Sequence, residues 1–169
     1  MKYILINEEL DNETIPTYIK EIEDLQGEEY TLFITTMGGF FYAVPVLAEV
    51  ILDSNCRKVI CVGDVNSAGV YLLLLLKQQI RVMAYPYVTM NIHLTKLHIQ
   101  DDIMVKQDDL VNSINSVNLY NHQIIDLLVK TTKIPSNIVE RLEKEEEVYL
   151  MGAQLVDFGF IDGFVEFNI

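Results

Sequence analysis

Three kinds of side chain in this sequence could together carry out nucleophilic catalysis: a serine hydroxyl, an imidazole and a carboxylate. Ser67 is the only residue with a nucleophilic hydroxyl in the polar turn of KVICVGDVNSAGVYLLLLLK, residues 58–77. A predicted strand precedes this turn and a predicted apolar helix follows it, which is how many hydrolases present a nucleophile. Backbone amides at a helix N-terminus also stabilise developing negative charge. The stretch therefore predicts Ser67 as a candidate nucleophile.

His93 is the histidine best placed to act as the base for this serine. Apolar and polar side chains alternate over residues 88–93, so His93 is expected at the end of a strand. A serine hydroxyl needs a neighbouring base to take its proton, and imidazole titrates in the right range. The rival histidines are His98, which follows the strand, and His122, which lies within a predicted long helix.

These two residues alone do not establish an active site. A serine in a turn is more often structural, and a histidine is more often a satisfied polar group. The usual nucleophile-elbow pattern requires glycine two residues before the serine, where this chain has Val65. A catalytic arrangement would also need a carboxylate to hold the imidazole and two amide donors for an oxyanion.

Gly38 and Gly39 are candidates for the oxyanion site. They follow a predicted strand at residues 30–35, and glycine lets backbone amides approach a substrate without an obstructing Cβ. If the sheet is parallel, the loops after its strands meet at one edge. We therefore expect the Gly38–Gly39 turn and the Ser67 turn at the same edge.

The elements that must position these residues alternate along the chain, which predicts an α/β fold with a largely parallel sheet. Thr14 is expected to cap the first helix with Pro16 in its first turn, and Pro45 is expected in the first turn of the second. Strands are predicted at 2–7, 30–35, 58–63, 81–84, 88–93 and 164–167, and helices at 14–26, 40–52, 70–77, 101–130, 134–143 and 149–157, the last capped by Gly159.

The predicted helix at residues 101–130 carries a narrow apolar stripe with heptad-like spacing and two polar positions. A long helix with such a stripe more often packs on another chain, where polar residues can set the register. The alternative is an amphipathic helix lying on its own sheet. The stripe consists of Ile103, Gln107, Leu110, Ile114, Val117, Asn121, Ile124 and Leu128.

Length, charge and cysteine content exclude several functional classes. The 169 residues fit one domain, and the formal net charge of −13 argues against nucleic acid and anionic membranes as partners. The longest apolar run, 70–76, is too short for a membrane span, and the N-terminus does not read as a signal peptide, so we expect a cytoplasmic protein.

Cys56 and Cys61 are expected as free thiols, with neither a disulfide nor a metal or other cofactor. The apolar content of 50% favours self-association.

The order of these motifs resembles the proteolytic subunit of Clp-type ATP-dependent proteases, the ClpP family of serine peptidases, over nearly the whole chain. LFITTMGGFF resembles the family's strand followed by Ser-Pro-Gly-Gly, and GDVNSAG resembles its Gly-x-x-x-Ser-x-Gly segment. MNIH resembles a strand end of the type VMIH, and YLMGAQLVDFGFID resembles FLSAxEAxEYGLID. The departures are Met37 for proline, Leu94-Thr95 for Gln-Pro, and Glu147 for aspartate.

The resemblance implies roles for particular residues. Ser67 corresponds to the nucleophile, His93 to the base and Glu147 to the residue that orients the imidazole, with Glu145 and Glu146 as competitors. Gly38, Gly39 and Ala68 correspond to the oxyanion and substrate-binding site, and no metal is implied. Phe40, Phe41 and Tyr42 would favour apolar side chains of a peptide or protein substrate.

The resemblance also implies an architecture: a single domain, 1–169, built as the spiral of β-β-α units that ClpP shares with crotonases. Its head would span about 1–95 and 131–169, and a protruding handle helix, about 96–130, would join stacked rings of a homo-oligomer. The chain starts at the family's first core strand, without the segment that forms axial pore loops, which makes an ATPase partner doubtful. This short form resembles Clp-like proteases of phages and mobile elements.

Two alternatives to a peptidase stay open. A catalytically degenerate relative would keep the oligomeric assembly as a scaffold, which the substitutions around His93 and at Glu147 favour. A crotonase-type enzyme would use the same fold and paired oxyanion amides to bind acyl-CoA thioesters without a serine nucleophile. No recognisable nucleotide-pocket signal supports this last class.

Overall fold

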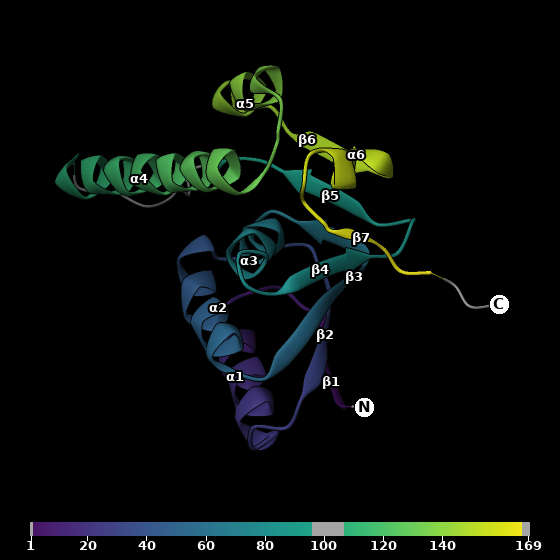
Figure 1. The fold of residues 1–169 in the computed structure, drawn as a ribbon. Coiled ribbons are helices and arrows are strands. Elements are labelled where there is room, and N and C mark those ends of the chain that lie inside the picture. Colours follow the sequence, from purple (N-terminus) through teal and green to yellow (C-terminus); the bar gives the residue numbers. More distant parts are fainter. Residues whose placement is uncertain (1, 96–106, 167–169) are drawn as a thin grey trace.

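The computed structural model describes residues 2–95 and 107–166, and a mostly parallel sheet organises them (Figure 1). The α/β prediction is confirmed, because every strand pair except β5–β6 is parallel. In spatial order the main path is β1 (Lys2–Ile6), β2 (Tyr30–Thr36), β3 (Cys56–Asn66), β4 (Arg81–Ala84) and β7 (Gly163–Phe164). Beyond this path, β5 (Thr89–Ile92) pairs with β3, and β6 (Val148–Met151) pairs with β5.

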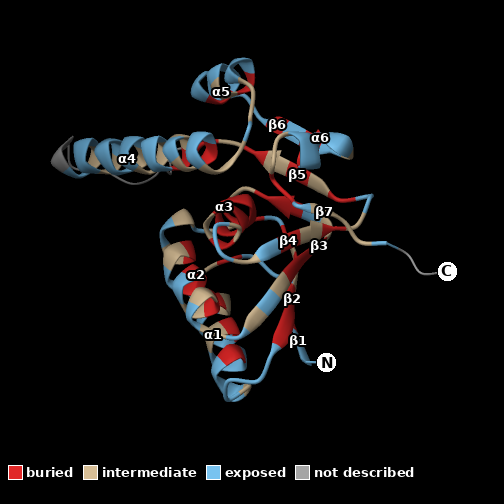
Figure 2. Cartoon of the chain, in the orientation of Figure 1, coloured by how far each residue is buried: buried red, intermediate tan, exposed pale blue. Residues whose placement is uncertain are grey.

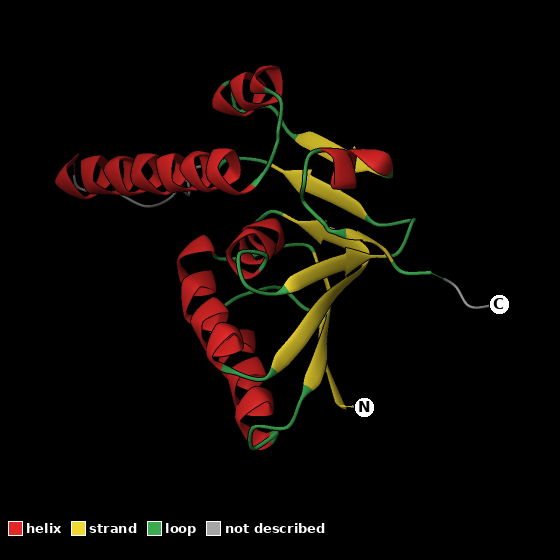
Figure 3. Ribbon diagram, viewed as in Figure 1, coloured by secondary structure: helices red, strands yellow, loops and turns green. Residues whose placement is uncertain are grey.

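Helices α1 to α3 lie on one side of the sheet and form the core with it (Figure 3). In α3 every residue except Leu75 is buried, as expected for a helix that is apolar all round. Helix α3 contacts both α2 and α4 and is therefore the centre of the helical layer. The helices are α1 (Thr14–Asp24), η1 (Phe41–Ala43, a 3₁₀ turn), α2 (Val44–Asp53), α3 (Ala68–Leu76), α4 (Gln107–Thr131), α5 (Ser136–Glu143) and α6 (Ala153–Asp157).

The first helix is capped by a different residue from the one predicted. Thr14 is already helical, and the Asp11 carboxylate instead accepts the backbone N–H groups of Glu13 and Thr14, both at 2.8 Å. These two bonds hold the pKa of Asp11 below its ordinary value, since they stabilise the ionised form. The prediction for Pro45 is confirmed, because it lies in the first turn of α2.

Strand β3 runs further than the sequence predicted. The stretch Asp64–Asn66, expected as part of a turn, continues the strand and pairs with Thr89–Asn91. The first part of β3 pairs with β4, and Gly63, at φ +70°, lies where the strand changes partner. A residue without Cβ accepts this positive φ without strain. The turn between strand and helix is thereby reduced to Ser67 itself.

The prediction of a helix over 149–157 was wrong in its first half. Val148–Met151 forms β6, in which Val148 and Leu150 are buried while Tyr149 and Met151 face outward. The segment becomes a strand because the free edge of β5 offers hydrogen-bond partners for its backbone N–H and C=O groups. Four residues are too few to distinguish the period of a strand from that of a helix. The second half forms α6, and Gly159 follows it at φ +75°, as a C-terminal capping glycine does.

Helix α4 extends away from the sheet, and its buried residues gather at the C-terminal end (Figure 2). Ile124 and Leu128 of the predicted stripe are buried within this chain, whereas Ile114 is exposed. The stripe is therefore divided: its last part packs within this chain, against α3 and not on the sheet that the alternative interpretation expected. Ile103 of the stripe lies outside the described residues.

Candidate active site

Ser67 occupies a strained position between β3 and α3. Its φ of +51° and ψ of −118° lie in a region that residues with a Cβ rarely adopt. Hydrogen bonds on both sides hold it there. Its N–H donates to the Asn91 carbonyl at 2.8 Å, and its carbonyl accepts the N–H groups of Val70 and Tyr71 at 3.0 and 3.2 Å. The serine is therefore fixed at the N-terminus of α3 by the junction of β3 with β5.

The Gly38–Gly39 loop lies directly against Ser67. A Cβ added to Gly38 would be 2.7 Å from the Ser67 Cβ, and Gly38 has a φ of +114°, so a side chain is excluded here. Leu10 pins the loop, since its N–H donates to the Gly38 carbonyl at 2.6 Å and its carbonyl accepts the Phe40 N–H at 2.7 Å. The two glycine-containing turns thus meet at one sheet edge, as the sequence predicted.

Backbone amides near Ser67 are available for a ligand. Within residues 2–95 and 107–166, the N–H groups of Gly39 and Ala68 donate to no protein acceptor. The Gly38 N–H, in contrast, is engaged by the Thr36 hydroxyl at 3.1 Å. Of the predicted oxyanion residues, Gly39 and Ala68 can therefore donate, while Gly38 allows the close approach.

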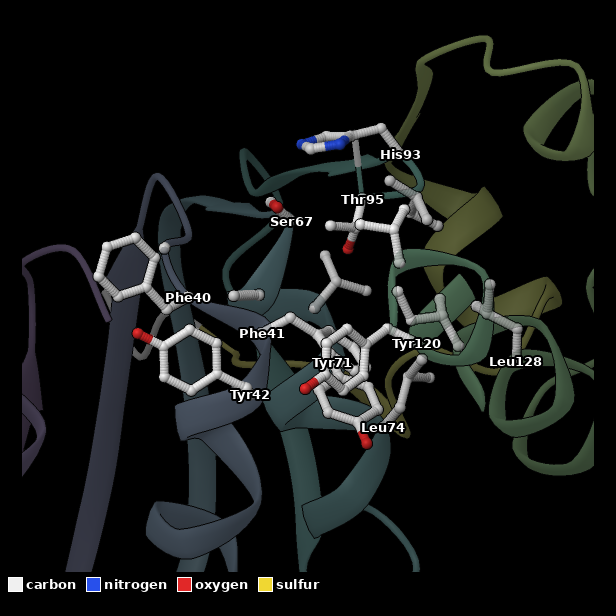
Figure 4. Close-up of a pocket in the computed structure, with 16 residues that line it drawn as sticks. Phe40, Phe41, Tyr42, Ser67, Tyr71, Leu74, His93, Thr95, Tyr120 and Leu128 are labelled. Atoms are coloured by element: carbon white, nitrogen blue, oxygen red, sulfur yellow. The ribbon is translucent and has the colours of Figure 1, made fainter. Parts of the chain in front are cut away.

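His93 directly follows β5 and lines the same pocket as Ser67. Figure 4 shows its imidazole and the Ser67 hydroxyl at one end of that pocket. The Nδ1 atom of His93 lies 3.1 Å from the carbonyl oxygen of Leu94. Because a carbonyl oxygen can only accept, Nδ1 carries the proton in this contact. The rival His122 is exposed on α4, and His98 lies outside the described residues.

Glu147 immediately precedes β6, and His93 immediately follows β5. The last pair of the β5–β6 ladder is Ile92 with Val148, so both residues adjoin the same end of that ladder. The Glu147 carboxylate accepts hydrogen bonds from the Tyr149 hydroxyl at 3.0 Å and from the Asn91 side-chain amide at 3.4 Å. The bond from Tyr149 raises the pKa of that phenol, because the carboxylate stabilises its protonated form.

The competing glutamates are placed differently. Glu146 pairs with Arg141 at 2.7 Å, and Glu145 follows α5 with a φ of +61°. Glu147 is therefore the member of the run that lies beside β5. The Nδ1–H of His93 donates to the Leu94 carbonyl.

The pocket beside Ser67 and His93 is apolar and has a volume of about 640 Å³. Its floor is an aromatic stack in which the ring of Phe41 lies 3.9 Å from that of Tyr71 and 5.5 Å from that of Tyr120, centroid to centroid (Figure 4). Burial raises the pKa of Tyr71. The sequence analysis identified Phe40, Phe41 and Tyr42 but missed Tyr71 and Tyr120, which come from α3 and α4.

Neither a metal-ligand group nor a membrane-spanning helix is found among the described residues. Among them, no three His, Cys, Asp or Glu side chains are grouped as metal ligands would be. No helix within the same residues has the length and apolar character needed to cross a bilayer.

Comparisons with known proteins agree with this architecture. The family model described as Clp protease matches residues 2–168. A solved structure, a point mutant of ClpP1 from Listeria monocytogenes, matches with a TM-score of 0.76 and 19% sequence identity, covering 99% of this chain and 92% of that chain. No curated protein sequence matches. Since the family model spans nearly the whole sequence and the fold is that of ClpP, the chain belongs to the Clp protease family.

Proposed function

We propose that this chain is a Clp-type serine peptidase that cleaves peptides or unfolded protein through an acyl-enzyme. The observation that carries the proposal is the position of Ser67. It is held at the N-terminus of α3 in a strained conformation, against Gly38, in the pocket that His93 also lines. Strained backbone conformations persist where surrounding structure enforces them, and they cluster at active sites.

In the proposed mechanism, the Ser67 hydroxyl attacks the scissile carbonyl while His93 takes its proton. The neutral imidazole with hydrogen on Nδ1 has its lone pair on Nε2, the atom that would act as the base. The amides of Gly39 and Ala68 would bind the oxyanion, helped by the dipole of α3. His93 then returns the proton to the leaving amine. Glu147, which adjoins the same end of the β5–β6 ladder as His93, is the proposed source of negative charge that stabilises the imidazolium.

The aromatic floor of the pocket supports a preference for apolar peptide side chains. Phe41, Tyr71 and Tyr120 form this floor, and the described residues that line the pocket include no Asp, Glu, Lys or Arg. Burying a large apolar side chain there would be worth about 1.5–3 kcal/mol. We therefore expect peptides with a large apolar residue before the scissile bond to be cut fastest.

Assembly into a homo-oligomer, with α4 as the handle of stacked rings, is part of the proposal. The N-terminal half of α4 supports it, because Val111, Ile114 and Leu119 are exposed there. Exposed apolar side chains gathered on one element favour a protein partner.

A fluorophosphonate probe tests the peptidase mechanism. The probe should label the folded, assembled protein once, on Ser67, as read by intact mass and peptide mapping. Ser67→Ala should abolish labelling, and His93→Ala should reduce the rate by about 10³-fold, since the base would be lost. Labelling elsewhere, or an unlabelled assembled sample, would contradict the proposal.

A non-catalytic scaffold is the second candidate, and one observation favours it. The Nδ1–H of His93 donates to the Leu94 carbonyl, and the Glu147 carboxylate accepts hydrogen bonds from Tyr149 and Asn91. A scaffold predicts that His93→Ala leaves the oligomeric state, the thermal stability and every reaction with the probe unchanged.

A further inference from the structure

Asn121 of α4 binds both backbone polar groups of Thr95. Its Oδ1 accepts the Thr95 N–H at 2.8 Å, and its Nδ2 donates to the Thr95 carbonyl at 3.1 Å. A primary amide offers one acceptor and one donor side by side, so it pairs with a backbone as a strand would. The polar position in the helical stripe that could have set the register with another chain is therefore used within this one.

The peptide unit between Leu94 and Thr95 connects Asn121 to His93 through two hydrogen bonds. The Thr95 N–H and the Leu94 C=O belong to the same planar peptide and point in opposite directions. The N–H donates to Asn121, and the C=O accepts from Nδ1 of His93 at 3.1 Å. Turning this plane would break both bonds at once, and hydrogen bonds in such a chain polarise one another. Asn121 thus determines the orientation of the group that holds the imidazole.

We propose that Asn121 is a positioning residue that fixes the tautomer and orientation of His93 through the Leu94–Thr95 peptide. With the proton held on Nδ1, Nε2 is left as the acceptor of an imidazole that lines the same pocket as Ser67. This role rests on the proposed peptidase function, in which Nε2 is the base. It assigns to a backbone carbonyl the orienting task that the sequence analysis gave to Glu147.

The surroundings of Asn121 make it a rigid anchor. Ile124 and Leu128, on the following turns of α4, are buried in the core, and Tyr120 packs against Phe41. The side chain of Asn121 therefore projects from the part of α4 that is fixed to the chain's own core. Any displacement of α4 would reach His93 through these bonds.

Three variants separate this role from a general structural one. Asn121→Ala removes both bonds to Thr95. Asn121→Asp keeps an oxygen for the Thr95 N–H but sets a second, negatively charged oxygen against the Thr95 carbonyl, and the two acceptors repel. Asn118→Ala is the matched control, because Asn118 is exposed on the same helix. Each variant is assayed by the saturating rate and half-saturating concentration of fluorophosphonate labelling, with oligomeric state from light scattering.

We expect Asn121→Ala and Asn121→Asp each to lower the saturating rate about tenfold or more at unchanged half-saturation, with Asn118→Ala within about threefold of the parent protein. An Asn121→Ala protein that labels at the parent rate overturns the proposal. So does a loss in Asn118→Ala equal to that in Asn121→Ala, because the effect would then not come from the bonds between Asn121 and Thr95.

A measurement independent of activity accompanies the kinetics. Long-range ¹⁵N–¹H correlation of the imidazoles reports which nitrogen carries the proton, and His93→Gln assigns the His93 signals. The parent protein should show His93 protonated on Nδ1, and Asn121→Ala should lose that preference. An unchanged tautomer overturns the positioning role. If the parent protein is not labelled but the tautomer shifts, the peptidase function fails and the positioning role stands.

Discussion

Replacing Ser67 by glycine should stabilise this protein, whereas replacing it by alanine should not. Ser67 has a φ of +51° and a ψ of −118°, a conformation that clashes with any Cβ but not with glycine. Alanine keeps the Cβ and therefore the strain. The comparison isolates the backbone conformation, because both substitutions remove the hydroxyl.

The size of the effect follows from two opposing contributions. A residue held in such a region costs of order 1–3 kcal/mol, which glycine would recover. Glycine also loses about 0.4–1 kcal/mol more conformational entropy than alanine on folding. The difference, about 1 kcal/mol in favour of Ser67→Gly over Ser67→Ala, corresponds to a rise in Tm of about 2–4 °C for a domain of this size.

Thermal and urea unfolding at one fixed protein concentration would measure this difference, since association makes Tm depend on concentration. Light scattering of both variants ensures that the same oligomer is compared. If Ser67→Ala unfolds at the same temperature as Ser67→Gly or above it, the backbone at Ser67 is not strained. The structural basis for assigning it as an enforced, reactive position would then be lost.

Two further predictions concern α4 and α1. Leu128→Ala should cost about 2–5 kcal/mol in urea unfolding, because Leu128 is 0% exposed, while Val129→Ala, at a position 57% exposed on the same helix, should change stability by less than about 0.5 kcal/mol. Equal effects would mean that α4 does not pack on the core as described. Asp11 has a pKa lowered by backbone N–H groups of Thr14 and Glu13, so its stabilisation is present above the ordinary value of 3.8 and is lost as pH falls through the folded-state value. The stability advantage of the parent protein over Asp11→Asn, from urea midpoints, should therefore shrink below that pH, and an advantage that grows would contradict the cap.

The sequence was sufficient for the parts of the fold that depend on local pattern. Residues 88–93 alternate so regularly that His93 could be placed at a strand end, and Val88, Met90 and Ile92 are indeed buried. Gly38–Gly39 and Ser67 could be placed at one sheet edge because parallel strands align their carboxyl ends. The roles of Ser67, His93 and Glu147 in catalysis stay predictions.

Other features depend on partners far away in the sequence. β6 forms because β5 offers a free edge, which the residues 149–157 do not reveal. Asp11 caps α1 from a position before the helix. The sequence pattern favoured Thr14 instead, because threonine is a common capping residue and stands directly at the start of the apolar pattern. Asn121 looked like a polar position in an intersubunit stripe, since nothing local shows that Thr95 lies against it.

The sequence by itself determined the alternation of strands and helices, the apolar α3 and the positions where glycine removes an obstructing side chain, because periodicity and the absence of a Cβ are properties of short segments. Tertiary structure alone decided which groups meet: the Leu94 carbonyl with His93, Asn121 with Thr95, and Tyr71 and Tyr120 with Phe41. Hydrogen bonds and ring contacts form over a few ångströms in space. Which residues come within that range is fixed only when the sheet register and helix packing are complete.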